Sequence, residues 1–308
     1  MQEIRNSGAA NFQKLALSGD EKSPSPNKIF LKINFGSPDL TWDRYGLAET
    51  PILFNGAKTP YKAITRENKL VTILGNGYKV LPNEEAVKIA DEAAEMAGLV
   101  PFHEFSGEWF QRMEKHVIYD KDQARVHALY ASNKHYDVNG EKMHIGVGVH
   151  NSIDGTTAFG CGIFTFRHAC ANMVLAGTRK YTQQFDQRKT IEYIYQRHTA
   201  SLNPVTGDLK NKILTVMDRA NEIISTYQRM ATEKATQQLI ERLRKSRLSA
   251  KVLPDYVAKP EEAIPPADLT QWQLYNDITA AIWHNAKAGL RTKQHRFNVL
   301  HQIIPIST

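Results

Sequence analysis

The densest group of side chains capable of chemistry lies between His144 and Val174, in the stretch HIGVGVHNSIDGTTAFGCGIFTFRHACANMV. Imidazole and carboxylate groups of this kind could hold a metal ion. The candidate ligands are His144, His150, Asp154 and His168. Spacing across strands does not fix a coordination geometry, so scattered surface or hydrogen-bonding histidines are the alternative. A metal here would imply a metal-dependent enzyme acting on nucleic acid.

The polar residues Asn151, Ser152 and Asp154 also have the composition of a catalytic cluster. All three are turn formers whose side chains bond to their own backbone, so we expect a structural turn instead. The sequence contains no nucleotide-phosphate loop, no nucleophile elbow and no zinc-protease motif. Several glycines of this stretch fall inside expected strands, where glycine marks a bulge or a close backbone approach. We therefore favour binding over catalysis and expect no cofactor.

Arg167 is the first candidate for a functional side chain. It follows the apolar run Gly162–Phe166, where a charge is costly unless it is paired. One interpretation is a buried ion pair, with Asp154 across the hairpin as a possible partner. The other interpretation is a phosphate contact, for which a planar guanidinium is well suited. The sequence leaves both open.

Positive charge is confined to one part of the chain. The net charge is +7, and residues 179–259 hold 16 Lys and Arg against 8 Asp and Glu, whereas the remainder holds 23 against 24. A confined basic stretch is the expected footprint of a polyanion, most often nucleic acid, although it could also serve solubility. The most basic patch is Glu241–Arg247, and part of its charge also suits a helix C-terminus.

Binding of single strands without sequence preference needs cations for the backbone and rings on which bases stack. The candidate contacts each combine a cation with a neighbouring aromatic residue or an expected strand or hairpin tip. They are Arg66, Lys69, Tyr78, Lys79, Arg125, Lys134, Tyr136, Arg167, Arg179 and Lys180. Each one alone is better explained by ordinary surface charge, so the prediction depends on the group.

Strand patterns fill the first 178 residues, with a hairpin tip at Glu67–Lys69 and the second strand of the central hairpin at Thr156–Phe166. The exception is one helix expected at 83–97, with Asn83 as its N-cap and Gly98 just past its end. Helical periodicity dominates after residue 179, with a helix expected at Tyr181–His198 and one long helix or a broken pair over 209–248. Asp268 is expected to cap a last helix at about 269–290. Strands and helices that segregate along a chain predict an α+β fold. We expect an antiparallel, hairpin-rich sheet with a crossing helix, followed by a mostly helical C-terminal region.

The predicted organisation is a flexible arm at 1–28, an α+β sheet domain at 29–178, a basic helical region at 179–253, a linker at 254–267, and a C-terminal helix and tail at 268–308. No apolar run reaches the roughly 18 residues of a membrane span, and no secretory signal is expected. Two cysteines fit a reducing compartment. We therefore expect a cytoplasmic location, inside a host cell.

Several stretches resemble the phage/plasmid-like protein family, which is catalogued as a domain of unknown function and found in viruses, plasmids and mobile elements. They are Gly77–Ala86, Arg125–Leu129, His150–Ala158, Phe166–Asn172, Val252–Tyr256 and Thr270–Thr279 with His284. The resemblance spans roughly residues 58–295. Met173 departs from the pattern, because a glycine or a small polar residue is expected there.

This resemblance implies a distant similarity to the single-strand annealing proteins of phages. Those proteins pair a β-hairpin sheet with a crossing helix, and they form rings or filaments that hold single-stranded DNA in a basic groove. On this basis we expect a single-stranded DNA-binding, ATP-independent strand-annealing or recombination protein that acts as a homo-oligomer. The alternatives are the metal-dependent nucleic-acid enzyme and a virion or assembly protein.

Overall fold

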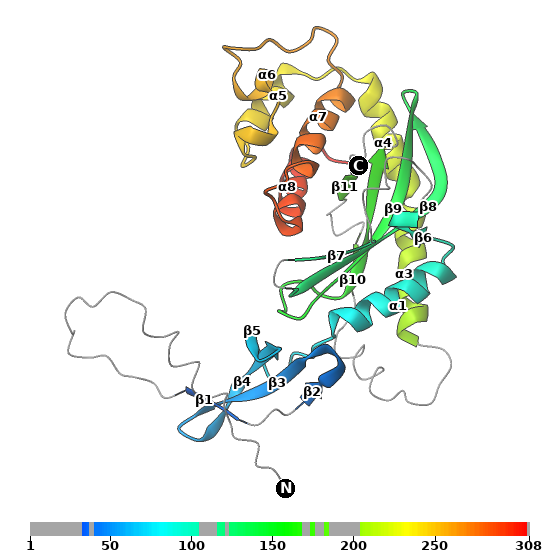
Figure 1. Cartoon of the computed structure of the whole chain (residues 1–308). Coiled ribbons are helices and arrows are strands. Elements are labelled where there is room, and N and C mark those ends of the chain that lie inside the picture. The colour runs from blue at the N-terminus through cyan, green and yellow to red at the C-terminus, as the bar shows by residue number, and fades with distance from the viewer. Residues whose placement is uncertain are drawn as a thin grey trace, which may run out of the picture. The chain divides into compact units, whose positions relative to one another are not determined.

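A computed structural model of the chain describes residues 33–36, 40–104, 116–120, 123–167, 173–175, 182–184 and 204–306 (Figure 1). Contacts divide the chain into two compact units, Met1–Tyr78 and Lys79–Thr308. The division falls inside the segment predicted as one sheet domain. The predicted boundaries after residues 178 and 253 do not separate compact units, because later helices pack on the sheet. The expected arm lies outside the described residues.

The first unit is a small antiparallel sheet. Its elements are β1 (Ile33–Phe35), β2 (Leu40–Trp42), the 3-10 helix η1 (Asp43–Tyr45), β3 (Leu47–Phe54), β4 (Ala57–Arg66) and β5 (Lys69–Gly75). The strand order is β1-β3-β4-β5, and β2 also pairs with β3. Asn55, Gly56, Glu67 and Asn68 form two tight turns and all have positive φ, as type I′ hairpin turns require. The hairpin expected near Glu67 is therefore confirmed.

The second unit is built on a larger antiparallel sheet, in which the described strands follow the order β11-β10-β9-β8-β6. Two further short strands attach to it, β12 to β10 and β7 to β8. The strands are β6 (Val100–Pro101), β7 (Val117–Tyr119), β8 (Arg125–Val138), β9 (Glu141–Ser152), β10 (Gly160–Arg167), β11 (Met173–Leu175) and β12 (Thr182–Gln184). β12 lies where the sequence pattern had predicted the start of a helix.

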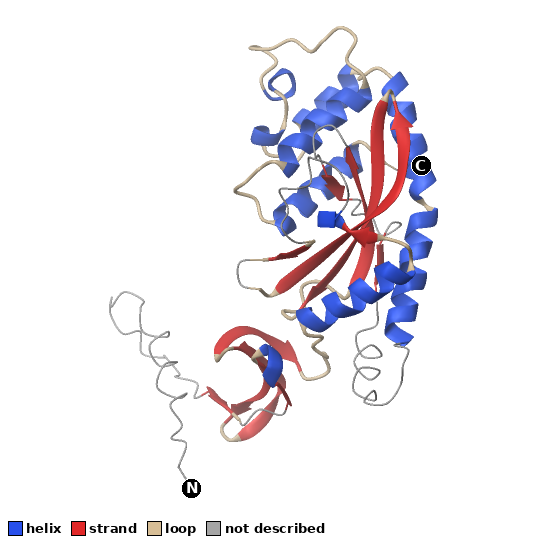
Figure 2. Cartoon of the chain, turned by 45° about the vertical axis from the view of Figure 1, so that its right-hand side comes forward, coloured by secondary structure: helices blue, strands red, loops and turns tan. Residues whose placement is uncertain are grey.

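The helices of the second unit are α1 (Asn83–Met96), α3 (Pro204–Asp218), α4 (Ala220–Thr232), α5 (Gln237–Arg244), α6 (Asp255–Ala258), α7 (Gln271–Trp283) and α8 (Leu290–Ile303), with the short 3-10 helices η2 (Phe102–Glu104) and η4 (Ala250–Val252). α1 packs across β6, β8 and β9, and α3 and α4 also contact the sheet (Figure 2). α7 packs on α4, and α7 and α8 contact β11. The predicted α+β fold with its crossing helix is confirmed.

The start of α1 differs from the prediction. Asn83 is the first helical residue and does not cap the helix. Its side chain donates to the carbonyl of Gln123 (2.8 Å) and accepts from Nδ2 of Asn151 (2.9 Å). Asn151 also donates to the carbonyl of Leu81 (2.8 Å), so it ties β9 to the helix and is not a local turn former. Gly98 ends α1 with a φ of 72°, as predicted.

The β9–β10 hairpin is present, but β10 begins at Gly160 rather than at Thr156 as predicted. Ser152 Oγ donates to the carbonyl of Thr157 (2.8 Å) and accepts from its amide (2.9 Å), while Asp154 accepts from the amide of Thr156 (3.0 Å). These bonds hold the intervening residues in a turn, as expected for Ser152 and Asp154.

The C-terminal helices also start and end at other residues than predicted. The long helix expected over 209–248 is broken into α3, α4 and α5. α3 begins at Pro204, and proline suits the first turn of a helix because it has no backbone N–H that would lack a partner there. The expected linker contains α6, whose Val257 is fully buried. Thr270, and not Asp268, caps α7 through reciprocal bonds with Gln273.

The core of the second unit lies between its sheet and helices. Alternate residues of β9, including Val147, are buried on the face of the sheet that meets α1. On the same face the hydroxyl of Tyr130 in β8 donates a hydrogen bond to Asp91 of α1 (2.8 Å). On the opposite face a Cβ added at Gly146 would lie 2.1 Å from Cζ of Phe164. The Phe164 ring covers that glycine, which confirms the close approach predicted for a glycine within a strand.

A buried row of polar side chains joins the sheet to three helices. Thr165 of β10 hydrogen-bonds Tyr227 of α4 (2.9 Å), Tyr227 lies 3.5 Å from the hydroxyl of Tyr275 in α7, and Tyr275 hydrogen-bonds His301 Nε2 in α8 (3.0 Å). Burial lowers the pKa of His301 from 6.5 to about 3, so its ring is neutral in the folded protein.

We expect His301 to make stability depend on pH. In the unfolded chain its ring takes up a proton below about pH 6.5, whereas the folded pKa is about 3, so the contribution is complete above pH 6.5 and is lost as pH falls towards 3. At pH 5 the loss is about 2 kcal/mol. Urea unfolding at pH 7 and pH 5 measures it. His301→Gln should lose less stability on acidification than the natural protein; an equal loss would contradict the assignment.

Candidate nucleic-acid interface

The sequence at and just after α5 places its exposed charges away from the core. Leu239, Ile240 and Leu243 are buried at helical spacing, and Thr236 caps the helix by accepting from the amide of Leu239 (3.2 Å). Arg242 and Lys245 therefore project into solvent. Arg244 turns the other way, because its Nε donates to the carbonyl of Val257 (3.0 Å) and its guanidinium pairs with Glu241.

These exposed cations line a groove between α5 and α8, which we call the α5–α8 groove. It has a volume of about 590 Å³. Its lining residues are Gln238, Glu241, Arg242, Lys245, Ser246, Arg247, His295, Val299, Gln302 and Ile303. The one carboxylate among them, Glu241, is paired with Arg244. The groove is therefore basic, which favours an anionic ligand.

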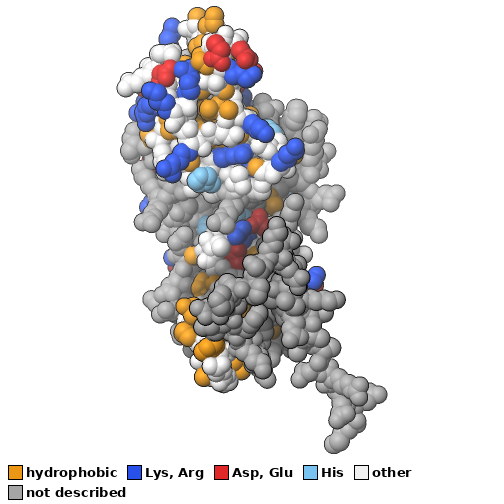
Figure 3. Space-filling model, turned by 90° about the vertical axis from the view of Figure 1, so that its left-hand side faces the viewer, with side chains coloured by type: hydrophobic (Ala, Val, Ile, Leu, Met, Phe, Trp, Pro, Cys, Tyr) orange, Lys and Arg blue, Asp and Glu red, His pale blue; other side chains and the backbone are white. Residues whose placement is uncertain are grey.

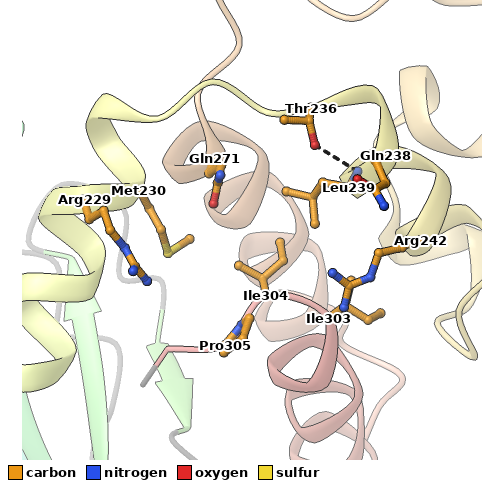
Figure 4. Close-up of a pocket in the computed structure, with 10 residues that line it drawn as sticks. All are labelled: Arg229, Met230, Thr236, Gln238, Leu239, Arg242, Gln271, Ile303, Ile304 and Pro305. Carbon is orange, nitrogen blue, oxygen red and sulfur yellow. Dashed lines mark hydrogen bonds between the residues drawn. The ribbon is translucent and has the colours of Figure 1, made fainter. Parts of the chain in front are cut away.

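A second hollow adjoins the groove, and we call it the side pocket. It has a volume of about 260 Å³ and lies where α4, α5, α7 and the end of α8 meet (Figure 4). It shares Gln238, Arg242 and Ile303 with the groove. Its other lining residues are Arg229, Met230, Thr236, Leu239, Gln271, Ile304 and Pro305. The pocket thus adds amide and apolar groups to the cations of the groove.

The surrounding surface has the same mixed character. Figure 3 shows Lys and Arg side chains spread over the upper part of the face that it presents, with apolar side chains among them. The basic patch predicted at Glu241–Arg247 therefore contributes to an exposed, hollowed surface. A nucleic-acid strand needs both features, because its phosphates are anionic and its bases are largely apolar.

Arg125 was predicted to contact phosphate, but in the structure its side chain contacts other residues of the protein. Its guanidinium pairs with Asp120 (2.8 Å) and Asp154 (2.7 Å), and its Nε donates to Thr156 (2.6 Å). Burial raises the pKa of Asp154, but hydrogen bonds from Thr156 and the charge of Arg125 outweigh it and hold that pKa below its ordinary value. Arg125 is therefore a structural residue that holds the β9–β10 turn.

Arg167 forms an ion pair, but its partner differs from the suggested one. It pairs with Glu141 of β9, which also accepts from Nε1 of Trp272 in α7 (3.4 Å). Asp154 cannot serve because it is bound to Arg125. The register places Tyr136, Met143 and Arg167 in one row across β8, β9 and β10. Tyr136 packs against the core there, so its ring is only partly available for stacking.

The remaining predicted contacts are divided between the two units. Lys79 and Lys134 are exposed, whereas Arg66 at the β4–β5 hairpin is 9% exposed. Lys69 is exposed at the same hairpin. The carbonyl of Tyr78 accepts a hydrogen bond from Lys62 Nζ. Arg179 and Lys180 lie outside the described residues.

The proposed metal ligands are not brought together. His144 and His150 share one face of β9 but are six residues apart, which is about 20 Å along a strand. His144 stacks on Phe166 (5.1 Å between ring centres), and Asp154 is occupied by Arg125. Burial lowers the pKa of His150 to about 3. His168 lies outside the described residues, and within them no three His, Cys, Asp or Glu side chains form a metal-binding group.

The sequence indicated only one of the two sides of the α5–α8 groove. Its α5 side is the most basic patch of the chain, but the candidate contacts were chosen for aromatic or strand neighbours, which Arg242, Lys245 and Arg247 lack. Its α8 side, with His295 and Ile303, comes from a segment about fifty residues further along and carries no local signal.

A family model described as a domain of unknown function, DUF932, matches residues 71–303. This match covers about three quarters of the chain and includes the whole described sheet of the second unit and the α5–α8 groove. The chain belongs to this family. No curated protein and no solved structure matches it. The expected membership of a family of unknown function is confirmed, and the DUF932 description itself names no activity.

No helix among the described parts of this DUF932 chain is long and apolar enough to span a membrane.

Proposed function

We propose that this DUF932 protein binds single-stranded DNA and lets complementary strands anneal without ATP. The observation that carries the proposal is the α5–α8 groove, where Arg242, Lys245 and Arg247 surround a hollow in which the one carboxylate is already paired. A strand of phosphodiesters is the extended anion that such a row of cations would bind.

The three cations are available for phosphates. Among the described residues, no ion pair or side-chain hydrogen bond involves the guanidinium of Arg242 or Arg247 or the ammonium of Lys245. All three residues are exposed. A bound phosphate would therefore displace water and counterions and would break no interaction within the protein, so binding should be sensitive to salt.

Strand annealing follows from backbone neutralisation. Two complementary strands repel each other through their phosphates, and a protein that neutralises one backbone lowers that repulsion while most of the bases stay free to pair. The sequence contains no nucleotide-phosphate loop, so the proposed reaction uses binding energy alone.

The test is a titration of the full chain with a labelled single strand and the matching duplex from 50 to 300 mM salt, followed by annealing of complementary oligonucleotides without ATP. Three phosphate contacts predict that the logarithm of the single-strand affinity falls with the logarithm of salt with a slope of about −2 or steeper. The single strand should bind more tightly, and the protein should speed annealing. Absence of binding at 50 mM salt would overturn the proposal.

The expected homo-oligomer is part of the same proposal. Sizing the protein by light scattering with and without a single strand tests it, because assembly on DNA should raise the mass of the complex above that of one chain with one strand. Oligomers of unchanged size with no bound DNA would favour the alternative of a virion or assembly protein.

A further inference from the structure

The side pocket opens beside the row of cations that we assign to phosphates. Arg242 and Gln238 border both the pocket and the α5–α8 groove. Figure 4 shows Gln271 of α7 and Ile304 pointing into the space between α4 and α5, with Arg229 and Arg242 on opposite sides. A group attached to a strand in the groove could therefore enter the pocket while its phosphate stays beside Arg242.

Part of the pocket wall is apolar, although polar groups make up more of its accessible surface. Met230 is 1% exposed, Ile304 is 3% exposed and Leu239 is 9% exposed, so each belongs to the core and shows only a small area to the pocket. Well-packed side chains of this kind form a preformed surface, and burying a flat apolar ring against it removes that ring from water.

Two amide groups belong to the polar part of the pocket, beside Arg229, Thr236 and Arg242. The hydrogen bonds formed between described residues include none from the side-chain amide of Gln238 or Gln271. The backbone of Gln271 is held by a bond from its amide to the carbonyl of Glu233 (2.9 Å), which fixes the start of its side chain. Each carboxamide offers both a donor and an acceptor, and the pairing edge of a nucleobase presents the complementary groups.

We infer that the side pocket receives one unpaired nucleobase of the strand whose phosphates lie along the α5–α8 groove. This inference rests on the proposed function. The base contacts the apolar wall with one face, and its pairing edge bonds to Gln238 and Gln271. A base within a duplex already uses that edge and is stacked on both faces, so the pocket selects single strands.

The experiment compares a mixed-sequence single strand of 20 nucleotides with an abasic strand of the same length and charge, by fluorescence anisotropy at 100 mM salt. The full natural chain should bind the intact strand roughly tenfold more tightly, as expected when base contacts are removed. Gln271→Leu changes a residue that lines the side pocket and not the α5–α8 groove, so it should lose a large part of that preference and keep its affinity for the abasic strand. Gln237→Leu, an exposed glutamine on α5 outside the pocket lining, is the matched control and should keep the preference.

The outcomes separate this inference from the proposed function. The natural chain could bind intact and abasic strands with equal affinity and the same salt dependence. That result would overturn the inference of a base pocket but would agree with the proposed binding of the phosphate backbone. Failure to bind either strand would overturn both. The comparison of the two strands uses the natural chain, so it holds whether or not the Gln271→Leu variant folds.

Discussion

Replacing Arg242 and Lys245 together by glutamine is expected to weaken single-strand binding roughly tenfold to fiftyfold at 100 mM salt. Two fewer phosphate contacts release fewer counterions, so the salt slope should become shallower by about 1.4. Both side chains are exposed and glutamine is a good helix former, so α5 should keep its structure. Anisotropy titrations at several salt concentrations measure the affinity and the slope together.

The matched control is Lys88→Gln/Lys142→Gln, which removes the same charge from exposed positions on α1 and β9. If the net charge of the protein alone determined the affinity, the two double variants would lose the same affinity. We expect the control to keep almost all of its affinity and its full salt slope. Equal losses in the two variants would show that the groove is not the binding surface.

Replacing Arg125 by methionine is expected to lower the free energy of unfolding by about 3 kcal/mol. The substitution leaves Asp120 and Asp154 mostly buried without their cation, and breaking a buried pair from one side is strongly destabilising. Methionine keeps much of the side-chain volume, so the loss reports the charge more than a cavity. Urea unfolding at pH 7 measures the change.

The control is Lys142→Met, which removes an exposed charge and should change stability by less than about 0.5 kcal/mol. Folded Arg125→Met should bind single strands with an unchanged salt slope, because the guanidinium serves the turn and not a phosphate. A shallower slope with unchanged stability would restore the phosphate contact first predicted for this arginine.

Local patterns in the sequence predicted local structure well. The type I′ turn at Glu67–Asn68 and the glycine end of α1 depend on neighbouring residues alone, so their signals are complete within a few positions. The segregation of strands and helices likewise predicted the α+β class. Asn83 was misassigned as a cap because its tertiary partner, Asn151, is 68 residues away and outweighs the local preference.

The candidate site was harder to predict because its parts come from distant segments. Arg125 looked available, but its partners lie 5 and 29 residues along the chain and meet it only when the turn forms. Glu141 reaches Arg167 through strand pairing that composition does not reveal. The α5–α8 groove forms only when α8 packs beside α5, so the basic patch gave the charge and not the shape.

The most direct test of the α5–α8 groove as the binding surface is to locate a bound strand on the protein. A single strand carrying a photoreactive pyrimidine can be crosslinked to the full natural chain at low salt, and the attached peptides identified by mass spectrometry. We expect crosslinks in residues 229–247 and 290–305, which hold the groove and most of the side pocket. Crosslinks confined to the first unit or to the β8–β10 strands, with none in these two segments, would contradict it.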